Sequence, residues 1–207
     1  MDTLSLVLAS GIEFSRNLLG ILFRPYQTYR RLVERGRLAE LIYLGALLVF
    51  YFALASLIKT AAFRPFLLTK QFIVLSGGAA GGFLLAAALF WLVGISVGGQ
   101  GKLVSFFLAW AYTLVPTLLW FLGTSVAYLL LPPPRTNSLL GITFSVVYLL
   151  FSASLFWWKL TLLYLTLRFG LKLDFLRIVA VIVVVFPLLG LWSWLMYRLG
   201  IFRVPFL

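Results

Sequence analysis

The sequence predicts an all-α protein, a polytopic transmembrane helical bundle of five spans that follows an N-terminal amphipathic helix in the membrane interface. Two observations carry this prediction. First, 63% of the 207 residues are hydrophobic and only 11% are charged, whereas a soluble domain carries about 25% charged residues. Second, charge-free apolar runs recur along the chain, and a helix needs about 20 apolar residues to cross the hydrocarbon of a bilayer. The solvent for most of this chain is therefore lipid.

The charge-free runs place the five spans. Two antiparallel helices and their turn need roughly 40 residues, and no run reaches that length, so each run holds one span. The approximate spans, within a domain of residues 39–207, are 41–58, 76–97, 106–131, 139–160 and 178–197. Turns and loops rich in charge, glycine or proline separate them, at residues 59–70, 98–102, 132–138 and 168–177.

Residues 1–38 form a separate amphipathic and basic segment before the first span. Residues 3–23 are apolar, but Glu13, Arg16 and Asn17 interrupt them. The segment lacks the basic start and the small-x-small cleavage site of a signal peptide. A helix that lies in the membrane interface fits this pattern. The alternative is a short sixth span.

Lysine and arginine are distributed unevenly between the two sides of the predicted bundle. With five spans, ten of them lie on the N-terminal side and six on the opposite side. Because cytoplasmic loops carry the excess of basic residues, we expect the N-terminus inside and the C-terminus outside. All five acidic residues lie on the same inner side.

The net charge of +12 would suggest nucleic acid in a soluble protein, but here the basic residues lie between apolar runs. This spacing indicates topology signals and contacts with anionic lipid headgroups, and it predicts no nucleic-acid partner. The predicted headgroup residues concentrate just before the first span: Arg24, Arg30, Arg31, Arg35 and Arg37.

Three pairs of glycines at four-residue spacing lie in and just after the second span. This spacing puts two glycines on one helix face, where two backbones can approach closely. The pairs are Gly77 with Gly81, Gly78 with Gly82, and Gly94 with Gly98. They predict helix packing, either at the seam of a homo-oligomer or, as is more frequent in polytopic proteins, against another helix of the same chain.

Two prolines lie inside predicted spans. Pro116 removes a backbone donor and clashes with the carbonyl four residues earlier, at Tyr112, so the third span should kink there. The hydroxyl of Thr113 or Thr117, or a neighbouring helix, should satisfy the freed carbonyl. Pro187 predicts a similar irregularity in the fifth span. Such a kink either shapes the bundle or lines a cavity.

Lys159 is the only charge embedded in a long apolar segment, residues 139–167. A charge within the membrane is a candidate functional site. The alternative is that the span ends near Trp158 and the lysine stem reaches the inner interface. In the functional interpretation, Glu40 at the inner end of the first span is the best counter-ion.

Residues that carry catalysis or bind metals are scarce. The chain has no cysteine and no histidine, which removes the thiolate and imidazole ligands and the side chain that titrates near neutrality. No acidic residue lies inside a predicted span, and no paired carboxylates, Ser-His-Asp set or phosphate-binding loop occurs in the sequence. We therefore expect no enzyme, no cofactor and no metal site.

Three stretches of the sequence resemble the Yip1-domain family of polytopic membrane proteins. They are a basic lead-in at residues 24–32, RPYQTYRRL, a Gly-Gly turn at 98–106, GGQGKLVSF, and a small-Tyr…Pro element at 109–116, AWAYTLVP. The likeness covers roughly residues 20–197. It implies five helices with the N-terminus inside and the C-terminus on the far side. The short form resembles prokaryotic members, which implies the cytoplasmic (inner) membrane.

Eukaryotic relatives act in vesicle traffic and associate with Rab GTPases and with one another. This chain lacks their long polar N-terminal domain and their Asp-Leu-Tyr-Gly-Pro type motif, so the resemblance does not extend to Rab binding.

Together these observations predict a non-enzymatic membrane scaffold or adaptor that acts through helix packing and contact with the lipid surface. Its predicted partners are anionic membrane lipids and either a second copy of the chain or another membrane protein. The alternative is a small permease or lipid-handling transporter subunit with a polar intramembrane cavity. The side chains expected to line such a cavity are Lys159, Thr113, Thr117, Ser125, Ser145 and Ser152.

Overall fold

The structure, a computed structural model, describes residues 3–59, 65–130 and 139–200. Within them the chain forms helices and short turns and no strand. The elements in chain order are α1 (Thr3–Phe23), α2 (Pro25–Arg35), α3 (Glu40–Lys59), α4 (Pro65–Ser96), α5 (Leu103–Tyr112), α6 (Leu114–Leu130), α7 (Leu139–Leu165), the π-helical turn η1 (Thr166–Gly170) and α8 (Phe175–Arg198). The predicted proline loop at 132–138 lies outside the described residues, as does part of the predicted segment 59–70.

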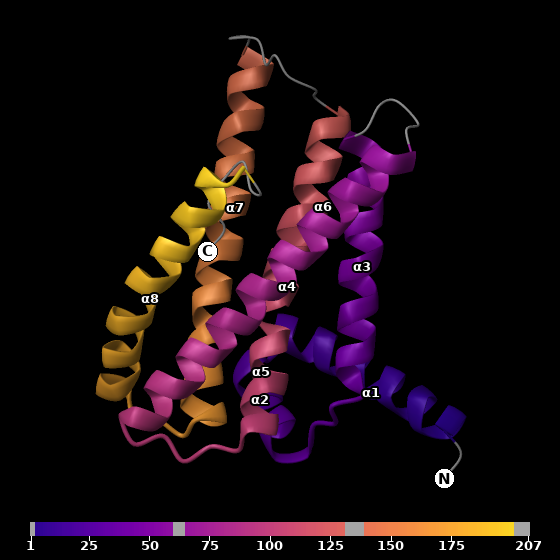
Figure 1. The fold of residues 1–207 in the computed structure, drawn as a ribbon. Coiled ribbons are helices and arrows are strands. Elements are labelled where there is room, and N and C mark those ends of the chain that lie inside the picture. The colour runs from indigo at the N-terminus through magenta and orange to yellow at the C-terminus, as the bar shows by residue number, and fades with distance from the viewer. Residues whose placement is uncertain (1–2, 60–64, 131–138, 201–207) are drawn as a thin grey trace.

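Long apolar helices make up most of the molecule. Figure 1 shows α3, α4, α7, α8 and the consecutive pair α5 and α6 running between its lower and upper ends, whereas α1 lies across the lower end, packed beside α2. Four stretches of the described chain are long and apolar enough to cross a membrane: Phe72–Ser96, Leu103–Ala127, Gly141–Gly170 and Phe175–Arg198. Glu40–Ala55 is a shorter apolar helix. Over the described residues the fold is therefore an all-helical bundle of membrane type.

Two helices extend beyond the predicted spans. Helix α4 begins at Pro65 rather than near residue 76, since proline is favoured at the first helical position and the exposed Lys70 does not interrupt a helix. Helix α7 continues past residue 160, and η1 follows it. The extra turns form because Leu162, Leu165 and Leu167 are buried between neighbouring helices.

Helix α5 lies at the centre of the bundle and joins its two hydrophobic cores. Leu108 and Tyr112 pack in one core, with residues of α1, α2, α3, α6 and α7. Phe106 and Trp110 pack in the other core, with residues of α4, α8 and the end of α7. Because protein covers both faces of α5, an irregular helix end can lie here without exposing backbone groups to lipid.

The third predicted span is interrupted at Thr113, between α5 and α6. The Thr113 backbone N–H and hydroxyl both donate to the Trp110 carbonyl, at 3.0 and 2.7 Å, rather than to the Tyr112 carbonyl. Pro116 is the third residue of α6, where its missing N–H costs no helical hydrogen bond. In contrast, α8 is one continuous helix through Pro187, where the sequence predicts an irregularity.

Candidate functional site

Helices α1 and α2 together form an arm that packs against the lower end of the bundle. On α2, Thr28, Tyr29 and Leu32 are buried, at the spacing that places them on one helix face. The Tyr29 hydroxyl donates a hydrogen bond to the Ala109 carbonyl of α5, at 3.3 Å. Burial raises the pKa of the Tyr29 phenol above its usual value, so this group remains a neutral donor.

The end of α2 is held by two further contacts with α5. The Ser105 hydroxyl donates to the Val33 carbonyl at 3.1 Å, which satisfies one of the carbonyls that a helix end leaves open. Gly36 follows α2 and lies so close to α5 that a Cβ there would overlap the Leu108 side chain. These contacts set the orientation of α2 and turn its opposite side outward.

A buried polar cluster of Asn17, Glu40 and Tyr112, the Glu40 cluster, joins α1 to α3 and α5. Glu40 is the first residue of α3 and only 1% exposed. Its Oε2 accepts from Asn17 Nδ2 at 2.8 Å and from the Tyr112 hydroxyl, and its Oε1 accepts from the Arg37 backbone N–H at 3.1 Å. Three hydrogen-bond donors thus satisfy the two oxygens of this buried side chain. The carboxylate therefore anchors the arm from inside the bundle.

The structure brings Glu40 together with residues that sequence reasoning did not pair with it. The sequence marks Glu40 as a counter-ion for Lys159, but hydrogen bonds from Asn17, Tyr112 and Arg37 satisfy its carboxylate. Lys159 is half-buried on α7, which continues past it, and its role stays a prediction. The sequence does contain a signal for Asn17 as a member of this cluster: it is a polar residue in an apolar helix, and such a side chain needs a hydrogen-bond partner when it is buried.

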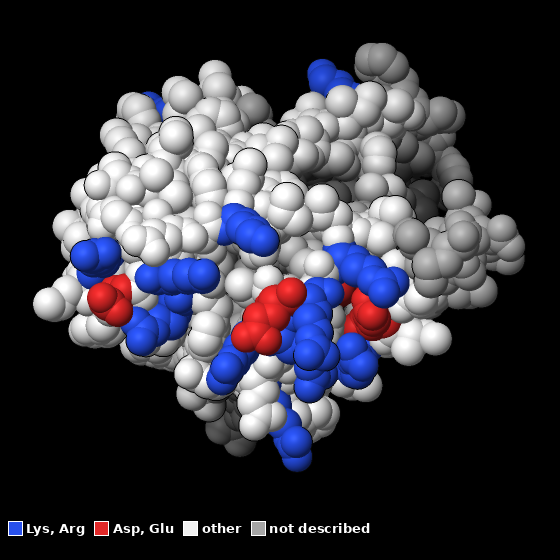
Figure 2. Space-filling model, turned by 90° about the horizontal axis from the view of Figure 1, so that it is seen from below, with Lys and Arg blue, Asp and Glu red and all other residues white. Residues whose placement is uncertain are grey.

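Cationic side chains gather on the lower face of the molecule. Figure 2 shows this face, with Lys and Arg in larger number than Asp and Glu. Three ion pairs are seen among the described residues: Arg30 with Glu34 at 3.2 Å, Arg37 with Glu13 at 3.6 Å and Arg168 with Asp174 at 3.0 Å. Within the same described part of the chain Arg31 and Arg35 form no ion pair. The face therefore keeps an excess of positive charge.

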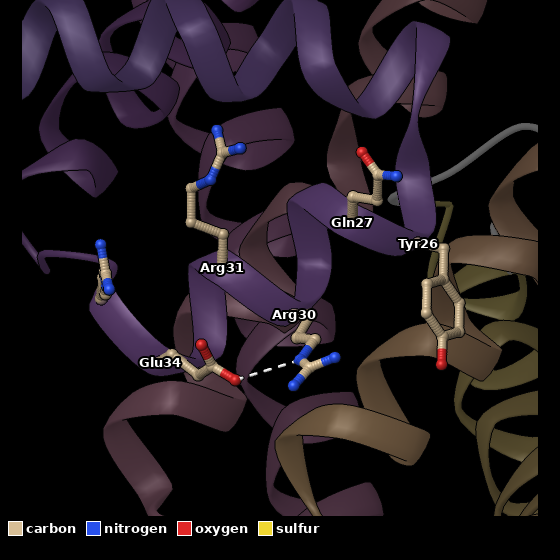
Figure 3. A pocket seen from close by; sticks show the side chains of 6 residues that line it. Tyr26, Gln27, Arg30, Arg31 and Glu34 are labelled. Carbon is tan, nitrogen blue, oxygen red and sulfur yellow. Dashed lines mark hydrogen bonds and ion pairs between the residues drawn. The ribbon is translucent and has the colours of Figure 1, made fainter.

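An open hollow of about 410 Å³, the α2 hollow, lies over the outward side of α2. Its lining residues are Tyr26, Gln27, Arg30, Arg31, Glu34 and Arg35. In Figure 3 Arg30 turns toward Glu34, whose carboxylate accepts a hydrogen bond from Arg30 Nε at 3.2 Å. Guanidinium groups bind phosphate or carboxylate through paired N–H groups. Three of the five predicted headgroup residues thus line one hollow, while Arg24 and Arg37 are exposed just before and after α2.

The predicted packing glycines fall into two groups. A Cβ at Gly82 would contact Trp192 of α8, and one at Gly94 would overlap Leu171. Gly98 has a positive φ of 93° and lies beside the Arg177 guanidinium. These three positions pack within the chain. At Gly77 and Gly81, in contrast, an added Cβ would have no atom of the described residues within 4 Å. Gly78 is half-buried.

The Gly-Gly turn before α5 packs closely against the end of η1. The Gln100 backbone N–H donates to the Leu171 carbonyl at 3.0 Å, and a Cβ at Gly101 would overlap the Gly170 carbonyl. Helix α2 packs against both α5 and η1. The three sequence stretches that carry the family resemblance therefore meet around α5.

A bundle of long apolar helices defines this chain as an integral, polytopic α-helical membrane protein. Its sequence matches the family model of the Yip1 domain over residues 19–197. The chain therefore belongs to the Yip1-domain family, a family of non-enzymatic membrane proteins, which confirms the resemblance seen in the sequence. No curated protein and no solved structure matched the chain.

Proposed function

We propose that this protein is a non-enzymatic membrane scaffold or adaptor that presents a basic surface to anionic lipid headgroups. The observation that carries the proposal is the anchoring of the arm. The Glu40 cluster holds α1, and the buried side of α2 packs on α5. Because contacts within the protein fix the orientation of α2, its arginines face outward before any lipid binds.

The proposed topology has five crossings, made by α3, α4, the pair α5–α6, α7 and α8, with the arm in the interface of the inner leaflet. Helix α3 has 20 residues, which at about 1.5 Å per residue spans the roughly 30 Å hydrocarbon core. In the proposed orientation the N-terminal side lies in the cytoplasm and the C-terminus outside, in an inner membrane, and the excess of cations on the N-terminal side supports it. A second copy would pack on α4 at Gly77 and Gly81, where small residues allow close approach.

The topology can be tested with single cysteines, because the chain has none of its own. We expect a membrane-impermeant maleimide to label Ser15→Cys in inside-out vesicles only, and Leu199→Cys in right-side-out vesicles only. Both side chains are exposed. Labelling of both positions from one side would contradict an odd number of crossings.

Lipid binding is tested on the full chain in nanodiscs that contain phosphatidylglycerol and phosphatidylcholine. We expect the protein to retain phosphatidylglycerol several-fold more than phosphatidylcholine, because each surface Lys or Arg contributes about 1 kcal/mol of attraction to an anionic leaflet. The preference should fall at high ionic strength, which screens exposed charges. Native mass spectrometry of retained lipid gives the measurement. The variant with glutamine at all five headgroup positions, Arg24, Arg30, Arg31, Arg35 and Arg37, should lose the preference.

The control is Lys70→Gln with Arg198→Gln, which removes two charges at exposed positions that the proposed topology puts on the other side. It should keep the preference for phosphatidylglycerol. Equal retention of both lipids by the unmodified chain, or equal loss in the control, would contradict the proposal.

One observation favours the transporter alternative: the helix interruption at Thr113 lies next to Thr117, whose buried hydroxyl has no hydrogen-bond partner among the described residues. Broken helices at membrane depth line substrate sites in many transporters. Other hydroxyls expected in a cavity are engaged, since Ser145 bonds to the Gly141 carbonyl and Ser152 accepts from Trp120. Hydroxyl groups that are already hydrogen-bonded within the protein favour the scaffold over a transporter with a polar cavity. Labelling of Thr117→Cys by a water-soluble maleimide would support transport instead.

A further inference from the structure

The α2 hollow carries a local charge that its own residues do not balance. Three arginines and one glutamate line it, which leaves a formal charge of +2. Glu34 is already hydrogen-bonded to Arg30. Arg31 and Arg35 are one helical turn apart and form no ion pair in the described part of the chain. Like charges at this spacing repel each other, so an anion placed between them would relieve an unfavourable contact.

The arginines of the α2 hollow project from a backbone that cannot easily turn away. The opposite side of α2 is buried and hydrogen-bonded to α5 through Tyr29 and Val33. At the rim, the Tyr26 ring packs edge-on against Phe169, with ring centroids 4.9 Å apart. Tyr26 and Gln27 also line the α2 hollow and carry neutral donor groups. Because the backbone that carries the arginines is fixed before binding, only their side chains lose freedom when a ligand arrives, which lowers the entropy cost of binding.

We propose that the α2 hollow binds a phosphate monoester. A phosphate monoester carries about −1.5 to −2 charges at pH 7 and offers three acceptor oxygens, which matches the +2 of the hollow. A phosphodiester such as phosphatidylglycerol carries only about −1 and would leave one arginine unneutralised. The phosphate comes either from a lipid with a monoester headgroup or from a soluble phosphorylated metabolite. The proposal rests on the proposed function in that it assigns a ligand class to the same basic surface.

The test compares phosphatidic acid with phosphatidylglycerol, each as a minor component in phosphatidylcholine nanodiscs that hold the full chain. Native mass spectrometry should show several-fold greater retention of phosphatidic acid. Arg31→Gln with Arg35→Gln should reduce phosphatidic acid to the level of phosphatidylglycerol. The control, Lys172→Gln with Arg177→Gln, removes the same charge from exposed positions outside the hollow and should keep the preference. Glycerol 3-phosphate added in excess identifies the source: displacement of the lipid indicates a soluble monoester, and no displacement indicates the lipid.

Two results would overturn the proposal. One is equal retention of phosphatidic acid and phosphatidylglycerol by the unmodified chain, and the other is loss of the preference in the control variant. If salt-sensitive binding of phosphatidylglycerol persists in either case, the proposal of a monoester site is wrong while the proposed scaffold function stands. If no anionic lipid is retained over phosphatidylcholine, both fail.

Discussion

Replacing Glu40 with alanine is expected to lower the free energy of unfolding by about 3 kcal/mol or more. The substitution leaves two buried donors, on Asn17 and Tyr112, and the part-buried Arg37 backbone N–H without their acceptor. Each unsatisfied buried donor costs about 1–3 kcal/mol. Unfolding in mixed detergent micelles measures the loss. Hydrogen exchange should also rise in α1, since Asn17 would no longer hold it to the bundle.

The control for this substitution is Glu34→Ala, which removes an acidic residue from an exposed ion pair with Arg30. Exposed pairs contribute about 0–1 kcal/mol, so this variant should unfold almost as the unmodified chain does. A double variant tests the contact directly: Asn17→Ala should cost much less in the Glu40→Ala background than alone. Equal costs in both backgrounds would show that the Asn17–Glu40 hydrogen bond does not hold the arm.

Replacing Gly101 with alanine is expected to destabilise the bundle by about 3 kcal/mol, the upper end of the usual cost of overpacking. The added Cβ would overlap the Gly170 carbonyl and crowd the Leu171 Cα. Both are backbone atoms, so no side-chain rotation can relieve the overlap. The turn before α5 would have to move away from η1, and the Gln100–Leu171 hydrogen bond would be lost. Thermal unfolding in detergent gives the measurement.

Two other glycines provide matched controls. Gly45 in α3 and Gly190 in α8 have no atom of the described residues within 4 Å of a Cβ. Alanine is a better helix former than glycine by about 0.5–1 kcal/mol, so Gly45→Ala and Gly190→Ala should cause no loss of stability. A loss as large as that of Gly101→Ala would mean that any added methyl group disturbs the bundle, and the specific close approach would be excluded as the cause.

Several features of the fold could be read from local sequence pattern. Apolar runs predict helices because every backbone group must be hydrogen-bonded within lipid, and α3 and α8 begin and end within a few residues of the predicted spans. Boundaries were less accurate where tertiary contacts extend a helix. Helix α7 continues past Lys159 because Leu162 and Leu165 are buried against other helices. A charge in the sequence therefore does not by itself mark the end of a helix.

The candidate site was predicted only in part. The sequence marks the arginines of α2, because a basic segment beside an apolar span is a local feature. It does not show that Arg31 and Arg35 face the same hollow while Tyr29 and Leu32 are buried. That assignment depends on which side of α2 packs against α5.

The sequence by itself determined that this protein belongs in a membrane, that its described elements are helices, and that it is a member of the Yip1-domain family. Composition, periodicity and short motifs carry that information, since they depend on neighbouring residues. Only the tertiary structure decided that Asn17 and Tyr112 meet Glu40 across 23 and 72 residues. Such contacts follow from the packing of whole helices, because a buried carboxylate bonds to whichever donors the folded bundle brings within reach.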